Sequence, residues 1–174
     1  YSIAYAPGAL TISPAALTVT ANAQTMHYGN AVPTLTYGIT SGALYGGDTL
    51  TGALATPASS TSGVGTYAIT QGTLAASSNY ALTYVGANVT VTPRPITVTA
   101  DAKSMIYGDA VPALTYAVGG SGLVNGDTLS GALATAASSA ASVGTYAITQ
   151  GSLAASRNYA LTYVGANVAI AARP

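Results

Sequence analysis

The sequence predicts a mainly β protein built from two tandem repeats. Apolar residues alternate with threonine in short segments, which is the pattern of strands with one buried face. The chain also matches itself at an offset of 79 residues; Tyr28, for example, corresponds to Tyr107. Self-similarity over a fixed period is typical of repeat proteins. We therefore expect the closing hairpin of a preceding, truncated repeat in residues 1–16, repeat 1 in residues 17–95 and repeat 2 in residues 96–174.

The strands of repeat 1 are expected in five places, each with an equivalent in repeat 2. Leu17, Val19 and Ala21 alternate with polar neighbours and predict the first strand. Threonine, tyrosine and valine, which suit a pleated and half-buried surface, predict further strands at residues 35–37, 67–70, 80–84 and 89–91. Gly86 and Asn88 predict a turn between the last two strands, as do Gly165 and Asn167 in repeat 2.

One stretch of each repeat predicts a short helical turn. Gly47-Asp48-Thr49-Leu50 and Gly126-Asp127-Thr128-Leu129 place an aspartate where it could act as an N-cap. The same aspartates are weak candidates for a metal site. A calcium site usually combines several carboxylates in one loop, and each repeat has one here, so capping is the favoured interpretation.

The junction between the repeats is Thr92-Pro93-Arg94-Pro95. Proline fixes its own backbone and favours extended neighbours, so Pro93 and Pro95 predict a stiff connection rather than a flexible linker. The last strand of repeat 1 should therefore lead almost directly into the first strand of repeat 2.

The composition argues against an enzyme. The chain has four Lys and Arg residues, four Asp and Glu residues, one His, no Cys and no net charge. A neutral chain offers no basic surface for nucleic acid or anionic lipid, and the absence of cysteine excludes thiolate chemistry. The sequence contains no apolar run of about 18 residues, the length that a membrane-spanning helix needs, so it predicts no such helix. We expect no catalytic residue, no cofactor, no nucleic-acid partner and no membrane insertion of this segment.

Single polar residues have structural interpretations. His27 is replaced by Ile106 in repeat 2, which argues against a catalytic or metal-binding role. Asn30 and Asp109 follow Tyr-Gly and suit a turn. Lys103 corresponds to Gln24, so a Lys–Asn crosslink is not a feature of every repeat.

Tyrosine is the most abundant aromatic residue and has two interpretations. Its rings could stack on sugars, but most of the tyrosines recur at the same offset in strands or turns, which favours packing. Tyr45 differs because Val124 replaces it, so Tyr45 is the candidate for contact with a partner.

The order of the motifs resembles a known family. A TVTA strand leads into Tyr28-Gly29-Asn30-Ala31-Val32-Pro33 in repeat 1 and into Tyr107-Gly108-Asp109-Ala110-Val111-Pro112 in repeat 2, and GDTL, VGTY and NYALTYV follow. This order resembles the MBG domain of the YGX type, a repeat of large bacterial surface proteins that include filamentous-haemagglutinin-like adhesins exported by two-partner secretion. The resemblance implies structural roles for Tyr28, Gly29, Pro33, Tyr107, Gly108 and Pro112.

The resemblance also implies a fold, a function and a location. The implied fold is β-grasp-like, with the first and last strands parallel and adjacent and with copies joined end to end in a rod; an Ig-like β-sandwich is the alternative. The implied function is a non-catalytic stalk in a secreted adhesin or biofilm-matrix fibre; a glycan- or protein-binding module is the alternative. The expected partners are neighbouring repeats, other adhesin chains and extracellular polysaccharide, at the surface of a bacterium. The Ala-rich, Lys-poor composition indicates a Gram-negative one.

Overall fold

The structure, a computed structural model, describes all 174 residues. It contains 13 strands and no helix, so the prediction of a mainly β protein is confirmed. None of its elements is a helix that could cross a membrane. The chain forms two compact units: unit 1 comprises Tyr1–Gln24, Pro33–Ala58 and Thr66–Thr90, and unit 2 comprises Thr25–Val32, Ser59–Gly65 and Val91–Pro174.

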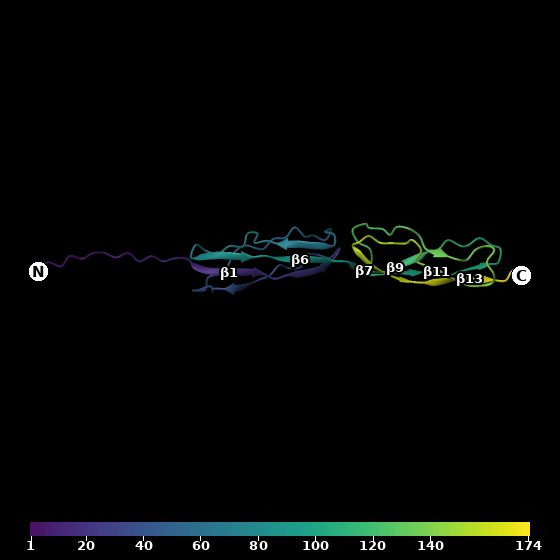
Figure 1. Cartoon of the computed structure of the whole chain (residues 1–174), viewed down its shortest axis with the longest axis horizontal. Coiled ribbons are helices and arrows are strands. Elements are labelled where there is room, and N and C mark those ends of the chain that lie inside the picture. The colour runs from purple at the N-terminus through teal and green to yellow at the C-terminus, as the bar shows by residue number, and fades with distance from the viewer. The chain divides into compact units, whose positions relative to one another are not determined.

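The strands of the first repeat form two three-stranded sheets, in the orders β3-β1-β5 and β2-β6-β4. Of these strands, β1 and β6 are labelled in Figure 1. Their bounds are β1 (Ala15–Ala21), β2 (Gln24–His27), β3 (Tyr37–Ser41), β4 (Gly65–Ile69), β5 (Tyr80–Val85) and β6 (Ala87–Thr92).

The second repeat has the same arrangement with one extra short strand. Its sheets have the orders β12-β7-β9 and β10-β11-β13-β8. The bounds are β7 (Arg94–Ala100), β8 (Lys103–Ile106), β9 (Tyr116–Gly120), β10 (Ala134–Thr135), β11 (Gly144–Thr149), β12 (Tyr159–Val164) and β13 (Ala166–Ala171).

The alternation in the sequence correctly identifies the buried faces. In β1, Leu17, Val19 and Ala21 are buried, and in β7 Ile96 and Val98 are at most 1% exposed. No polar or charged side chain is buried in the chain. The cores therefore consist of aliphatic residues, methionine and a few tyrosine rings, as expected for repeats that contain no Phe or Trp.

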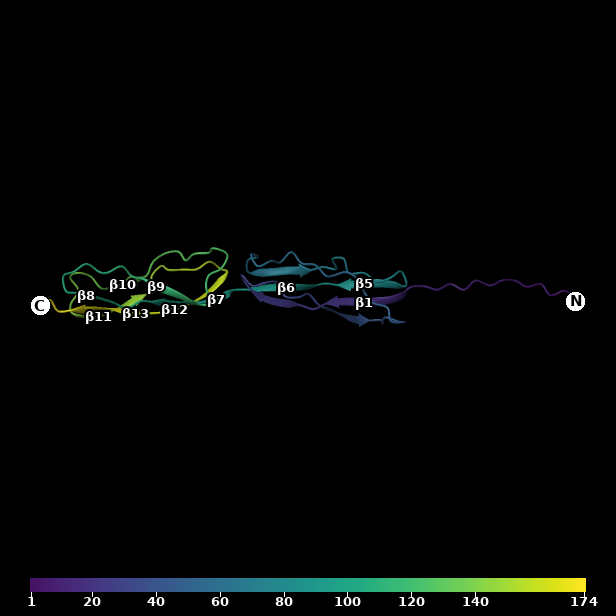
Figure 2. The same cartoon turned by 180° about the vertical axis from the view of Figure 1, so that it is seen from behind.

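The strand pairs that organise each repeat are parallel. In unit 2, β7 pairs with β12 from Arg94↔Tyr159 to Thr99↔Val164, and β8 pairs with β13 up to Ala171↔Ile106. In unit 1, β1 pairs with β5 in the same way. The first strand thus lies beside the penultimate strand, whereas we expected it beside the last. The reason is that β12 and β13, both labelled in Figure 2, are consecutive strands, and the chain passes from one sheet to the other between them.

The predicted turns at Gly86-Asn88 and Gly165-Asn167 are wrong. Neither glycine has a positive φ, and β12 and β13 do not pair with each other. A Cβ atom on Gly165 would lie 3.2 Å from the carbonyl oxygen of Ile148, and one on Gly86 would lie 3.1 Å from that of Ile69. Glycine is therefore required here for close approach of two backbones, where the strand passes from one sheet to the next.

No hairpin forms in residues 1–16, where the sequence predicts the closing part of a truncated repeat. Residues 1–14 form no strand, and β1 begins at Ala15. Tyr1, Ile3 and Tyr5 are at least 92% exposed. The equivalent strands β5 and β6 lie in different sheets, so residues 1–14 lack the partners that strands of this type use.

The predicted helical turn at Asp48 and Asp127 is wrong as well, because both aspartates close tight β-turns. The N–H of Asp127 donates to the carbonyl of Val124 at 3.0 Å, and the central residues Asn125 and Gly126 have φ of 57° and 76°. Asp48 closes the equivalent turn on Tyr45 across two glycines. Two consecutive positive φ values define a type I′ turn and exclude a right-handed helix.

The sequence also misplaced or missed short strands. The predicted strand at residues 35–37 begins only at Tyr37 and runs to Ser41. The four-residue strands β2 and β8 were missed, because they lie two residues after a long strand and have little periodicity of their own. Each is the edge strand of a sheet: β2 pairs with β6, and β8 pairs with β13.

The strand crossing at Gly165 leads to a stability prediction. We expect Gly165→Ala to lower the free energy of unfolding by about 1–3 kcal/mol, because its Cβ would press on a backbone oxygen that cannot move away cheaply. Gly119→Ala is the matched control, since its Cβ would be 3.9 Å from the nearest atom, the Thr97 carbonyl oxygen. It should be neutral or stabilise by about 0.4–1 kcal/mol. Urea unfolding measures the free energy of unfolding of both variants. Equal effects would contradict the close backbone approach at Gly165.

Candidate functional site

In each repeat, a tyrosine hydroxyl forms hydrogen bonds with both ends of a turn, one of which is an aspartate. In unit 2, the Tyr159 hydroxyl donates to Asp127 Oδ2 at 2.7 Å and accepts the N–H of Val124 at 3.1 Å. Asp127 and Val124 are the two ends of the type I′ turn described above. The hydroxyl therefore fastens this turn to the first residue of β12.

Unit 1 contains the same cluster. The Tyr80 hydroxyl donates to Asp48 Oδ2 at 2.9 Å and accepts the N–H of Tyr45 at 2.8 Å. Tyr80 is 9% exposed and Tyr159 is 7% exposed, so each ring is buried while its hydroxyl reaches the turn. Asp48 and Asp127 thus anchor a turn through a tyrosine and do not cap a helix.

These contacts change the acidity of the tyrosines. Burial raises the pKa of Tyr159; the Val124 N–H lowers this pKa, and Asp127 raises it further because a carboxylate disfavours a nearby phenolate. For Tyr80, the Tyr45 N–H has the largest influence and lowers the pKa, but burial and Asp48 outweigh it, so the pKa is raised. Burial alone raises the pKa of Tyr84 and Tyr163.

Neither aspartate belongs to a cluster of metal-ligating side chains. The structure contains no group of three or more His, Asp or Glu side chains that could hold a metal ion. Asp48 and Asp127 each accept a hydrogen bond from a tyrosine hydroxyl, and this contact fixes a loop. We call this arrangement the tyrosine lock.

His27 lies at the end of β2 and is exposed. Its Nδ1 atom is 2.9 Å from Thr92 Oγ1 and 3.2 Å from the carbonyl oxygen of Pro93. A carbonyl only accepts hydrogen bonds and Thr92 Oγ1 donates to Met26, so Nδ1 acts as the donor. His27 therefore holds the end of β6 in place.

The YGX turns of the two repeats have different surroundings. Tyr28 is 5% exposed and its ring meets that of Tyr159 edge to face, with centroids 5.5 Å apart. Tyr107 is 45% exposed. Asn30 and Asp109 close their turns on the carbonyls of His27 and Ile106, and Gly29 and Gly108 supply positive φ values of 83° and 89°.

An arginine holds each YGX turn. Arg94 Nη1 donates to Asn30 Oδ1 at 2.9 Å, and Arg173 Nη2 forms an ion pair with Asp109 Oδ1 at 2.5 Å. Sequence reasoning missed both arginines. Their recurrence at the offset of the repeats, in a chain with only four Lys and Arg residues, was the signal that could have found them.

Of the four prolines named from the sequence, two lie at strand boundaries and two in irregular segments. Pro93 is the single residue between β6 and β7, and Pro95 is the second residue of β7, where it pairs with Ala160. Proline is tolerated at the start of a strand because the missing N–H costs little there. Pro33 and Pro112 lie in the irregular segments before β3 and β9.

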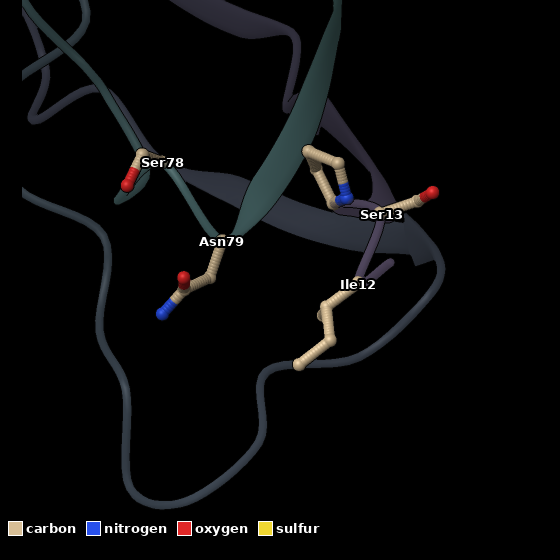
Figure 3. A pocket seen from close by; sticks show the side chains of 5 residues that line it. Ile12, Ser13, Ser78 and Asn79 are labelled. Carbon is tan, nitrogen blue, oxygen red and sulfur yellow. The ribbon is translucent and has the colours of Figure 1, made fainter. Parts of the chain in front are cut away.

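Tyr45, the predicted partner contact, is 65% exposed on the type I′ turn of unit 1. The same unit has a small open pocket of about 140 Å³ lined by Ile12, Ser13, Pro14, Ser78 and Asn79. Figure 3 shows Ile12 and Ser13 on one segment and Ser78 and Asn79 on the other. The pocket contains no charged side chain, so it offers hydrogen bonding and apolar contact but no acid–base chemistry.

Comparison with known protein families identifies the family of the chain. The family model described as MBG domain (YGX type) matches the chain twice, over residues 17–90 and 96–169. No curated protein and no solved structure matches the chain significantly. The two matches begin at the first residue of each repeat predicted from the sequence, and the tandem arrangement is thus confirmed.

The tyrosine lock leads to a mutational prediction. We expect Tyr159→Phe to lower the free energy of unfolding by about 1–3 kcal/mol, because it removes a hydrogen bond to a carboxylate and leaves the Val124 N–H without its acceptor. Tyr107→Phe is the control, because this ring is 45% exposed and should change stability by less than about 0.5 kcal/mol. Denaturant unfolding of the two variants measures the difference, and equal values would contradict the lock.

The raised tyrosine pKa values predict alkaline unfolding. Because the folded-state pKa values of Tyr80, Tyr84, Tyr159 and Tyr163 exceed the unfolded value, the folded state holds these protons more tightly. The stability from this linkage is fully present below about pH 10 and is lost as the pH rises through the folded-state pKa values. Melting temperature against pH, with tyrosinate absorbance, measures this. Unchanged stability at pH 11 would contradict it, and Y84F/Y163F should weaken the dependence.

Proposed function

We propose that this chain, which belongs to the MBG domain family of the YGX type, is a non-catalytic spacer that extends a bacterial surface protein. The family match supports a surface-protein repeat. The finer setting, a stalk in a secreted adhesin or a biofilm-matrix fibre of a Gram-negative bacterium exported by two-partner secretion, is part of the proposal. A β-grasp-like fold, with an Ig-like sandwich as the alternative, likewise stays a prediction.

The observation that carries the proposal is the parallel pairing within a repeat. In the second repeat, the first strand, β7, starts at Arg94 beside the first residue of β12, and the last strand, β13, ends at Ala171 beside the last residue of β8. The chain thus enters the repeat where the parallel strands β7 and β12 begin, and it leaves the repeat where the parallel strands β8 and β13 end. The start and the end of the repeat therefore lie at opposite ends of its strands. A repeat with this property adds length when copied, which favours an end-to-end rod.

A second candidate function is adhesion through unit 1. Tyr45 is 65% exposed and is replaced by Val124 in the other repeat, so it is a large exposed ring that the shared fold does not require. Aromatic faces are common contacts for sugars and for protein partners. We propose this glycan- or protein-binding role as the alternative, with extracellular polysaccharide or another adhesin chain as the ligand.

Chains of two, three and four repeats distinguish the candidates. If the repeat is a spacer, the maximum dimension from solution scattering should grow by a constant increment per repeat, about 30–45 Å for strands of this length. A compact particle whose dimension does not grow with repeat number would contradict the spacer. A glycan array with the wild-type chain and with Tyr45→Ala tests the alternative, which requires binding that the variant loses.

A further inference from the structure

Four residues at the YGX end of repeat 1 and their four equivalents in repeat 2 differ in what covers them. We call Tyr28, Gly29, Val64 and Arg94 the covered tip. We call Tyr107, Gly108, Val143 and Arg173 the open tip. The two sets are chemically identical and correspond at the offset of the repeats, so any difference in their surroundings comes from their neighbours.

The covered tip belongs to unit 2, where two loops of the second repeat pack on it. We call these loops, Ser121–Asn125 and Arg157–Tyr159, the covering loops. The Tyr159 ring meets the Tyr28 ring edge to face, and a Cβ on Gly29 would overlap Val124 Cγ2. Such close approach identifies a packed contact and explains why glycine is required at this position.

Directional hydrogen bonds accompany this packing. The Val64 N–H donates to Asn158 Oδ1 at 3.0 Å, and Arg157 Nη2 donates to the Val64 carbonyl at 2.8 Å. Asn125 Nδ2 donates to the Ser60 carbonyl at 3.2 Å, and Arg94 Nε donates to the Gly122 carbonyl at 3.0 Å. Both backbone groups of Val64 are therefore satisfied by the covering loops.

The open tip has the same groups without these contacts. Tyr107 is 45% exposed and Val143 is 57% exposed. The atoms nearest to a Cβ on Gly108 would be those of the Arg173 guanidinium, the first of them Nη2 at 3.4 Å, so no loop residue lies against Gly108 as Val124 lies against Gly29. Tyr107, Val143 and Arg173, with Ser142 and Ala172, line an open hollow of about 440 Å³.

We propose that the open tip is the binding surface for the covering loops of a further copy of repeat 2, joined directly after Pro174. The proposal deepens the spacer function and rests on it, since a spacer requires adjoining copies. The occupant is identified by the covered tip, where the same four residue types already bind these loops. The first repeat has Tyr45, Gly46 and Ser78 in place of Val124, Asn125 and Arg157, so a copy of repeat 2 is the better fit.

The test appends residues 96–174 to the full chain after Pro174, which reproduces the Arg-Pro-Ile order of the existing junction. In the extended chain we expect amide exchange at Val143 to slow by at least about tenfold, because its N–H gains the acceptor that Asn158 provides to Val64. Exchange at Val64, already bonded in the 174-residue chain, serves as the internal control and should not change.

A mutation gives an independent readout. Tyr107→Ala should change the melting temperature of the 174-residue chain by less than about 2 °C, but should lower that of the extended chain by at least about 5 °C. We expect a decrease of the same size for Tyr28→Ala in the 174-residue chain, where this ring is already buried. Unchanged exchange at Val143 and equal effects of Tyr107→Ala at both lengths would overturn the proposal. Protection of Val143 only in concentrated solutions of the unextended chain would also overturn it, by placing the occupant on another molecule.

These measurements use purified protein and report on the joint alone. The spacer function is tested by the growth of the maximum dimension with repeat number. A chain that lengthens with each repeat while Val143 stays unprotected would refute the open tip and leave the spacer intact. Protection of Val143 in a chain that does not lengthen with each repeat would refute the spacer and leave the open tip intact.

Discussion

The parallel pairing of β7 with β12, and of β8 with β13, is the constraint on which the second repeat depends. Parallel neighbours cannot be joined by a tight turn, so the chain must return along the repeat between them. That return is made by β9, β10, β11 and long connections of small and polar residues. The YGX turn, the type I′ turn and the loop before β12 all lie on this return path, which is why the contacts that hold it are shared by both repeats.

Tyrosine gives a chain without Phe or Trp both its aromatic packing and its polar anchors. Tyr80 and Tyr159 bury their rings and use their hydroxyls to hold a turn, and Tyr84 and Tyr163 donate to the carbonyls of Ile69 and Ile148 at 2.8 Å. A buried ring contributes a large apolar area, and a hydroxyl that ends on a turn satisfies its hydrogen bond at the edge of the core. No polar side chain is itself buried, so this arrangement stabilises the loops without the cost of a buried charge.

The candidate sites were only partly predictable. The sequence identified Asp48, Asp127 and the YGX residues as recurrent, but it assigned the aspartates to helix capping, because an N-cap and a turn that ends in aspartate share the Gly-Asp-Thr pattern. What separates them is the tyrosine 32 residues later whose hydroxyl reaches the carboxylate. A partner that distant leaves no local signature. The arginines at the YGX turns were missed for the same reason, since their acceptors lie 64 residues earlier in the sequence.

The sequence by itself determined the repeat period, the mainly β class and the buried faces of β1 and β7, because periodicity and strand alternation are properties of neighbouring residues. Only the tertiary structure decided which strands pair. Gly86 and Gly165 are typical of turns, yet they allow an extended segment to pass close to Ile69 and Ile148 and to enter a second sheet. Tyr28 is buried and Tyr107 is exposed although their local sequences are similar, because burial depends on what packs from outside the segment. A close backbone approach and a covering surface are made by residues far apart along the chain.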